Sequence, residues 1–267
     1  MNSTIPHHPH IEFTSHPNAF ARRRMLSCPG EPLFIAGWHR VVMIHFEMDP
    51  ATLQRAVPFP LDLWNGRAFV SLVAFTMYRM RPRVGGKLAA LLFRPIATHD
   101  FLNVRAYVRL GDECGIHFLA EWLSNRLAVL LGPATFGLPY HYGLTAYDHD
   151  WHHRSIRGQV TDAKNRTRLK YCGTLAGPGT LRPCVAGSLD EWLMERYTAF
   201  NAAGGRKRFF RVWHPPWPQC AANVQVDEIS LLTNIWPWFE SSPIVGANYS
   251  PGFDTVWMGR PHSLPRR

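Results

Sequence analysis

Cysteine is scarce in this chain of 267 residues, and its pattern matches no common motif. The chain has five cysteines, an odd number, and no two of them have C-x-x-C spacing. This pattern argues against a disulfide framework and against a cysteine-type zinc site. We interpret the cysteines as reduced thiols of the core and predict no metal site and no cofactor.

Long apolar runs are also missing. The longest uncharged stretch near the middle, residues 127–147, is interrupted by Gly132, Pro133 and Gly137, which is wrong for a bilayer span. Residues 1–17 are rich in His, Pro and Ser and contain no apolar signal core. We therefore predict a cytoplasmic protein with no membrane partner.

Three signatures of familiar enzymes are absent as well. The chain contains no Gly-x-Ser-x-Gly elbow, no P-loop and no Gly-x-Gly-x-x-Gly sequence. A serine hydrolase, a nucleotide hydrolase and a Rossmann dehydrogenase thereby lose their main support.

Positive charge is abundant but scattered. The formal net charge is +10, and 25 of the 29 cationic side chains are arginines, because the only lysines are Lys87, Lys164, Lys170 and Lys207. Apart from short runs at 22–24, 206–208 and 266–267, no segment forms a continuous basic stripe. This pattern favours a solvated surface over a nucleic-acid-binding face, which we keep as an alternative.

Aromatic residues are plentiful, at 13% of the chain, and hydrophobic residues reach 46%. Such a chain can bury a large core and line a pocket with rings. Residues 1–30 show no hydrophobic period and are expected to be a loose leader, so we predict one domain over residues 31–267. The pattern of many strands and few short helices predicts an α+β fold with a largely antiparallel sheet.

The expected elements follow local signals. Alternation predicts strands at 38–48, 68–80, 103–110, 116–122, 167–172 and 206–213. Helices are expected after Asp49, from Ser124 to Leu131, and after Ser188, the last one closed by Gly204-Gly205. Residues 64–67 read as a turn, and residues 81–96 and 173–183 as connections.

The segments 103–110 and 116–122 read as a hairpin. Centring its loop on Glu113 makes one face wholly apolar, by pairing Leu110 with Ile116, Val108 with Phe118, Ala106 with Ala120 and Val104 with Trp122. In that register Arg105 lies opposite Glu121.

One histidine-rich segment could suggest a metal. His149, His152 and His153 lie close together beside Asp148 and Asp150, but adjacent histidines point to opposite faces of a strand. We therefore assign no metal role to this cluster.

Several segments together resemble a known family. In order, they are Trp64–Ser71, Asn103–Arg109, Gly115–Phe118, Leu138–Tyr140, Glu195–Tyr197 and His214–Pro218. The ordered set resembles the YqjF-like branch of the acetoacetate-decarboxylase-like superfamily, over roughly residues 34–257. The resemblance implies a curved, barrel- or cone-like sheet around a cavity, with a few short flanking helices.

The resemblance also shows where this chain departs from the decarboxylases. Their segment Gly-aromatic-Pro-Lys-Lys supplies a Schiff-base lysine, and its counterpart here is Gly137–His141, with Tyr140 and His141 in place of the lysines. A phenol forms no imine, so a Schiff-base decarboxylase is not expected. The branch usually carries a Glu two residues before its Asn-x-Arg motif, and Phe101 stands there.

The candidate site residues come from the hairpin and from the segment that follows it. We predict Arg105, Asn103 and Tyr107 as substrate-binding residues, with Arg105 holding a carboxylate or an enolate. Glu121, Tyr140 and His141 are the candidate catalytic acid–base residues. The alternative for Arg105 and Glu121 is a cross-strand ion pair on a solvated face. His214–Pro218 is expected to form a rigid corner whose Trp217 fills the core.

These observations lead to one functional hypothesis and two alternatives. The protein is expected to bind a small anionic or carbonyl-bearing organic molecule in a β-cavity, with lysine-independent acid–base chemistry. The first alternative is a non-catalytic ligand-binding or structural protein of the same fold, and the second is a basic nucleic-acid-binding protein. A homodimer is one open alternative for the oligomeric state.

Overall fold

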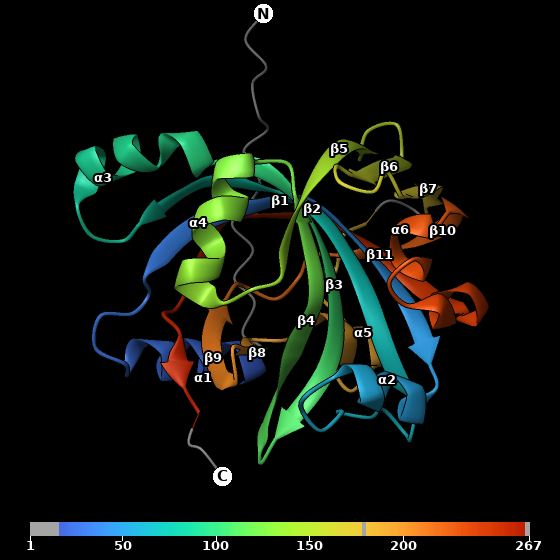
Figure 1. Ribbon diagram of the computed structural model, residues 1–267, viewed down its shortest axis with the longest axis horizontal. Coiled ribbons are helices and arrows are strands. Elements are labelled where there is room, and N and C mark those ends of the chain that lie inside the picture. Colours follow the sequence, from blue (N-terminus) through green and yellow to red (C-terminus); the bar gives the residue numbers. More distant parts are fainter. Residues whose placement is uncertain (1–15, 178–179, 265–267) are drawn as a thin grey trace, which may run out of the picture.

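The computed structural model describes residues 16–177 and 180–264, which form a twelve-stranded, mostly antiparallel sheet with short helices around it (Figure 1). The strands are β1 (Phe34–Met48), β2 (Ala68–Pro82), β3 (His99–Leu110), β4 (Glu113–Leu123), β5 (Tyr140–Asp150), β6 (Ser155–Asp162), β7 (Arg168–Leu175), β8 (Thr198–Ala203), β9 (Arg206–Trp213), β10 (Cys220–Glu228), β11 (Ile244–Met258) and β12 (His262–Ser263). The helices are α1 (His16–Leu26), α2 (Pro50–Ala56), α3 (Gly86–Phe93), α4 (Arg126–Phe136), α5 (Leu189–Met194) and α6 (Ser230–Thr233), with 3-10 turns η1 (Arg94–Ile96) and η2 (Pro237–Ser241). This confirms the predicted fold class.

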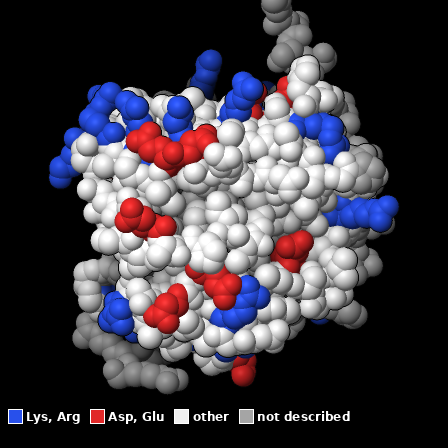
Figure 2. Space-filling model, turned by 90° about the vertical axis from the view of Figure 1, so that its right-hand side faces the viewer, with Lys and Arg blue, Asp and Glu red and all other residues white. Residues whose placement is uncertain are grey.

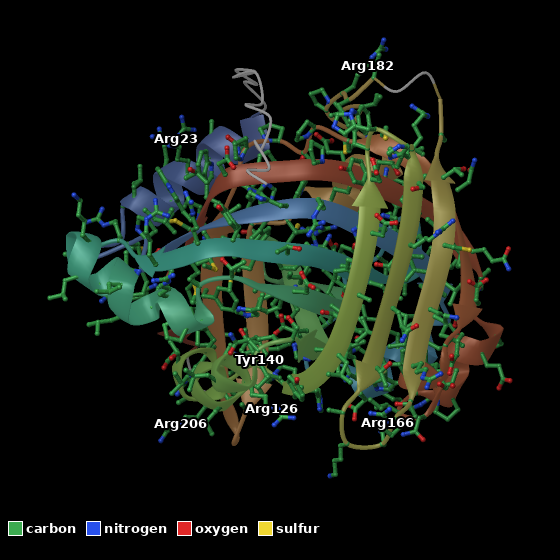
Figure 3. The ribbon with its side chains drawn as sticks, turned by 90° about the horizontal axis from the view of Figure 1, so that it is seen from above. Arg23, Arg126, Tyr140, Arg166, Arg182 and Arg206 are labelled. Carbon is green, nitrogen blue, oxygen red and sulfur yellow. The ribbon has the colours of Figure 1, made fainter. Side chains whose placement is uncertain are left out.

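The sheet closes on itself twice. Its order is β12-β9-β8-β4-β3-β2-β1-β11-β10-β7-β6-β5, and two extra pairings join β9 to β11 and β4 to β5. One ring therefore runs through β9, β8, β4, β3, β2, β1 and β11, and a second runs from β4 through β11 and β10 to β5. The sheet is ring-like without being a regular barrel. In Figure 3, β5, β6 and β7 cross steeply over the direction of β1 and β2.

The strands that the two rings share are buried on both faces. On β1, Val42, Ile44 and Phe46 belong to the larger apolar cluster, whereas Val41 and Met43 belong to a second cluster on the opposite face. Successive side chains of a strand point to opposite faces, so a strand between two cores needs apolar residues at consecutive positions.

The hairpin prediction is right about the strands and wrong about the register. Asn103 lies opposite Glu121, and after a bulge Arg105 lies opposite Phe118, so Arg105 does not face Glu121. The connection is a two-residue turn at Gly111, which has a positive φ, and Asp112, rather than a loop centred on Glu113. The observed register puts Val104 opposite Ala120 and places both in the larger cluster.

Other local signals were read correctly. Asp49 caps α2 by accepting from the Thr52 N–H (2.7 Å), and Pro50 is the first helical residue. Ser188 caps α5 by accepting from the Glu191 N–H (3.2 Å), and the predicted strand 206–213 is β9. All five cysteines are free, as predicted, although only Cys220 is fully buried.

Four segments differ from the predictions. Residues 86–93, expected within a connection, form α3, and α4 begins after Asn125 and continues through Pro133 to Phe136. Pro133 has no N–H to donate to the carbonyl four residues earlier, and the helix ends within one turn after it, at Phe136. Gly204-Gly205 is the turn of the β8–β9 hairpin, because α5 already ends at Met194. Residues 173–175, expected in a connection, extend β7.

The predicted leader is folded over residues 16–30. Helix α1 packs against β9, Met25 is fully buried, and the side-chain amide of Asn18 donates to the backbone oxygen of His214. The contact between Asn18 and His214 joins residues nearly 200 positions apart, so the local hydrophobic pattern of the sequence does not predict it. Residues 1–15 of the predicted leader lie outside the described residues.

Candidate ligand-binding cavity

The first ring of strands encloses a cavity of about 110 Å³. Each strand of this ring, β9, β8, β4, β3, β2, β1 and β11, contributes at least one side chain to its wall. That volume accommodates several water molecules or a small organic molecule. The fold thus builds a closed site from residues that are distant in the sequence.

Most of the wall is apolar and aromatic. Phe75 and Phe101 stack with their ring centroids 5.2 Å apart, and Tyr140 meets the Phe101 ring edge-on at 6.2 Å. Phe101, which stands where the related branch usually has a Glu, is therefore part of the apolar wall. An apolar wall lowers the local dielectric, so each polar group that faces the cavity interacts strongly with a ligand.

Arg105 is a buried cation that forms no ion pair with a carboxylate among the described residues. Its side chain is 7% exposed and lines the cavity. One terminal nitrogen donates to the Leu193 backbone oxygen (2.9 Å) and lies 3.5 Å from the Met43 sulfur, while Nε has no partner among the described residues. Burying a guanidinium without an anion is costly, which makes this position a strong candidate for anion binding.

Arg196 also lines the cavity, but unlike Arg105 it forms an ion pair with a carboxylate. Its Nη1 donates to Asp62 (2.7 Å), and both side chains are 4% exposed. Asp62 also accepts from Arg109 Nε at 3.0 Å. Arg196 packs over the rings of Trp192 and Tyr107, with 4.1 and 5.2 Å from Cζ to the ring centroids. Its Nη2 is unpartnered among the described residues and is free to bind a ligand.

Glu121 is the only carboxyl group of the cavity wall within the described residues. It is 2% exposed, and burial raises its pKa well above the ordinary range of a glutamate. Burial therefore favours the neutral, protonated form of Glu121, and in that form its carboxyl group can donate a hydrogen bond. Its Oε2, like Asn103 Oδ1 and Trp38 Nε1, has no hydrogen-bond partner in the described part of the chain.

Tyr140, one of the predicted catalytic residues, also lines the cavity. It is the first residue of β5, which pairs in parallel with β4 and places Tyr140 opposite Glu121. Burial, together with the neighbouring Glu121, raises its pKa well above the ordinary range of a tyrosine. Figure 3 shows Tyr140 projecting at the end of β5 that lies beside α4.

Tyr107 was predicted to contact the ligand, but it lies behind Arg105 and is not part of the wall. The Tyr107 hydroxyl lies 2.5 Å from Ser71 Oγ and 3.0 Å from the Leu193 backbone oxygen, and its single proton is shared between these two acceptors. Ser71 in turn hydrogen-bonds His45 Nδ1 (2.6 Å). Tyr107 therefore orients Arg105, whose Cζ lies 5.7 Å from its ring centroid.

A neutral histidine anchors this chain of hydrogen bonds. Burial, and secondarily the positive charge of Arg105, lowers the pKa of His45 to about 3. His45 Nε2 therefore donates to Asn248 Oδ1 (2.9 Å), and Nδ1 accepts from Ser71. The network is fully buried and links β1, β2, β3 and β11 beneath the cavity.

His141, predicted as a second catalytic residue, points away from the cavity. Alternation along β5 places it on the other face, where it is exposed and stacks on Trp122 with centroids 5.2 Å apart. The cavity thus brings together Asn103, Arg105, Glu121 and Tyr140, and it leaves out Tyr107 and His141.

The His214–Pro218 corner behaves largely as predicted. Trp217 is 1% exposed and donates through Nε1 to the Met194 backbone oxygen (3.0 Å), so it fills the core. His214 lines the cavity, and burial lowers its pKa to about 4, which keeps the imidazole neutral. Arg196 received no role from the sequence, although it lies in one of the motifs that carried the family resemblance.

An outer groove of about 360 Å³ adjoins the cavity between α1 and α5. Arg196 and Thr198 line both hollows and therefore lie between them. Glu195 lies in the groove wall and accepts from the Trp217 N–H (2.8 Å), and burial raises its pKa to about 7.

The histidine cluster does not converge on one point. His149 is buried and hydrogen-bonded to the Arg40 backbone oxygen (2.6 Å) and the Tyr171 hydroxyl (2.9 Å), whereas His152 and His153 are exposed. Elsewhere, the side-chain atoms of Cys28, Glu31 and His262 that could bind a metal lie within 4.8 Å of one another. There Glu31 Oε1 is paired with His262 and Cys28 accepts from Arg211 (3.5 Å), while Glu31 Oε2 has no partner among the described residues.

The architecture of the chain is that of the acetoacetate-decarboxylase-like fold class. The chain is similar to an acetoacetate decarboxylase-like enzyme from Sphingomonas wittichii RW1, with a TM-score of 0.60, 15% identity, and coverage of 89% of this chain and 95% of the other. The enduracididine biosynthesis enzyme MppR, complexed with pyruvate, has a TM-score of 0.58 and 11% identity, covering 88% of this chain and 91% of the other. Acetoacetate decarboxylase from Legionella pneumophila has a TM-score of 0.56 and 14% identity, covering 96% and 98%.

Within this class, the chain belongs to the DUF2071 family of uncharacterized conserved proteins, which it matches over residues 36–254. It is also 27% identical over 182 residues to the uncharacterized protein YqjF of Bacillus subtilis (strain 168), covering 67% of this chain and 72% of the relative. The family resemblance inferred from the motifs is thereby confirmed.

Proposed function

We propose that this protein binds a small organic anion, a carboxylate or a carbonyl-bearing compound, in the cavity, with Arg105 as its main contact. The observation that carries the proposal is the buried Arg105 guanidinium, which within the described part of the chain has no ion pair with a carboxylate and no hydrogen-bond partner for Nε. A bound carboxylate supplies the missing charge and accepts from Nε and a terminal nitrogen together, the bidentate geometry that arginine favours.

The remaining polar atoms suit the other end of such a ligand. The protonated Glu121 donates a hydrogen bond to a carbonyl oxygen, and the Tyr140 hydroxyl is a second donor beside it. A neutral acid in an apolar site can transfer its proton to a developing enolate, and it is then a general acid. The described wall contains no lysine, which supports chemistry without a Schiff base.

The comparison with MppR suggests which ligands to test first. That enzyme is complexed with pyruvate, which carries a carboxylate and a carbonyl on adjacent carbons. A compound of this kind would let Arg105 bind the carboxylate while Glu121 contacts the carbonyl oxygen. The first ligands to test are therefore 2-oxo and 3-oxo acids of up to about seven heavy atoms, in keeping with the cavity volume, with a 2-hydroxy acid for comparison.

Calorimetry with a panel of pyruvate, acetoacetate and lactate tests binding. We expect saturable binding that falls roughly tenfold or more in Arg105→Ala, because hydrogen bonds to a charged group are lost. Arg157→Ala, on the exposed face of β6, is the matched control and should bind like the wild type. No binding by the whole panel, or equal affinity in Arg105→Ala and the control, would overturn the proposal.

A second measurement separates catalysis from binding alone. Proton exchange at the carbon next to the carbonyl, followed by NMR, should be slowed by Glu121→Gln while the dissociation constant changes little. Binding without exchange would favour the non-catalytic alternative. Borohydride trapping should leave the intact mass unchanged, and a reproducible adduct on any lysine would contradict the lysine-independent chemistry.

The nucleic-acid alternative has less support. On the face shown in Figure 2, acidic and basic side chains lie among one another, and no continuous basic surface crosses it. Sequence-independent nucleic-acid binding depends on cations that follow a phosphate backbone.

A further inference from the structure

Two neighbouring helices expose leucines that the cavity does not use. On α3, Leu88, Leu91 and Leu92 are 67%, 61% and 71% exposed. Val84, just before α3, and Leu127, Leu130 and Leu131 of α4 are exposed as well. A contiguous exposed apolar surface usually indicates an interaction site.

The two helices form one surface. The Phe34 ring lies 5.5 Å from that of Phe93 at the end of α3 and 6.1 Å from that of Phe136 at the end of α4. The Asn125 amide, at the N-cap of α4, donates to the Pro95 backbone oxygen (2.7 Å) just after α3. Figures 1 and 3 both show α3 and α4 side by side at one edge of the molecule. We call these exposed side chains, Val84, Leu88, Leu91, Leu92, Leu127, Leu130 and Leu131, the α3–α4 surface.

The charges around this surface have one sign. Six exposed cations border it, namely Arg79, Arg81, Arg83, Lys87, Arg94 and Arg126. The segments 77–99 and 124–147 contain no aspartate and no glutamate. The exposed leucines are therefore surrounded by uncompensated positive charge, in a protein whose acidic residues lie elsewhere.

We propose that the α3–α4 surface binds the surface of an anionic lipid bilayer. Leucines that enter the boundary of the acyl chains, with arginine and lysine at the level of the headgroups, are the usual elements of peripheral membrane binding. The contact is peripheral, because the described residues include no helix long and apolar enough to span a membrane. This departs from the expectation of no membrane partner.

Charge distinguishes the bilayer from a second copy of the chain. A symmetric contact between two copies through this surface would bring its cations against each other, and like charges across an interface oppose association. Anionic headgroups neutralise the same cations. The charge pattern therefore favours the bilayer as the occupant.

Sedimentation of the full chain with vesicles tests the proposal. We expect binding to vesicles of phosphatidylcholine with phosphatidylglycerol, little binding to phosphatidylcholine alone, and weaker binding as salt increases. The variant Leu88→Ser/Leu91→Ser/Leu92→Ser should lose most of the bound fraction. Its control, Leu144→Ser/Val185→Ser, changes exposed apolar residues away from the surface and should bind like the wild type.

A charge-matched pair of variants tests whether the cations around the α3–α4 surface contribute to binding. Arg81→Gln/Arg83→Gln/Lys87→Gln and Arg157→Gln/Arg168→Gln/Lys170→Gln each remove two exposed arginines and one exposed lysine. Only the first should release the protein at low salt, with circular dichroism confirming that both variants fold. Equal release of the two would overturn the proposal. So would an absence of vesicle binding together with a dimer that the leucine variant dissociates, which would assign the surface to a second copy.

Discussion

Arg105 and Leu193 meet at the base of the cavity, where the guanidinium donates to the backbone carbonyl at 2.9 Å. The contact joins the middle of β3 to the last turn of α5, and the Tyr107 hydroxyl donates to the same oxygen. Arg105 is thus held by neutral partners from a distant segment, and its charge is left for a ligand. In the predicted pairing, a Glu121 carboxylate would have neutralised the charge of Arg105.

The first prediction concerns the stability of the ligand-free protein. Arg105→Met removes a buried charge that has no carboxylate partner, while Tyr107 still satisfies the Leu193 oxygen. We expect the free energy of unfolding, measured with urea, to stay within about 1 kcal/mol of wild type or to increase. A loss of several kcal/mol would show that Arg105 holds the fold together rather than serving a ligand.

The second prediction concerns Glu121 and alkaline pH. Its pKa is raised by burial in the folded state, so stability from its neutral form is present at low pH and lost as pH rises through the folded pKa. Between pH 5 and pH 9 the wild type should therefore lose more unfolding free energy than Glu121→Gln. The exposed Glu240→Gln serves as the control and should follow the wild type. Parallel pH profiles for the wild type and Glu121→Gln would refute the assignment.

The third prediction concerns acid destabilisation. Burial lowers the pKa of His149 from 6.5 to about 4, so the unfolded chain takes up a proton there before the folded protein does. Stability from this residue is complete above the unfolded pKa and falls as pH decreases toward 4. Between pH 7 and pH 5 the wild type should lose about 2 kcal/mol more than His149→Gln. The exposed His152→Gln should match the wild type, and equal losses in all three would contradict the prediction.

The fourth prediction compares two glycines of β11. Gly252 has φ +89°, and a Cβ there would lie 1.7 Å from the Trp38 backbone oxygen, whereas a Cβ at Gly246 meets nothing within 4 Å. Gly252→Ala should cost more than about 3 kcal/mol of unfolding free energy or prevent folding. Gly246→Ala should change it by less than about 1 kcal/mol. Similar effects at both positions would show that β11 does not follow β1 closely at Trp38.

Local signals in the sequence were sufficient where the interaction itself is local. Asp49 and Pro50 begin α2, Ser188 begins α5, and the alternation in 206–213 is that of β9, because caps and strand alternation depend on residues a few positions apart. The same alternation placed Asn103, Arg105 and Glu121 on one face despite the wrong register. Before the bulge, at Asn103, the register error is two residues, which preserves the face of a strand, whereas an error of one reverses it.

Contacts between distant segments were decided only by the tertiary structure. The register of β3 and β4 depends on a bulge and on a two-residue turn, and the folding of α1 depends on its contacts with β9. Likewise, the sequence placed arginine at 105 and glutamate at 121, but the closed ring of strands decided their partners. The ring seals Glu121 from water and brings the Leu193 carbonyl to Arg105. Neither contact can be predicted from residues that are neighbours along the chain.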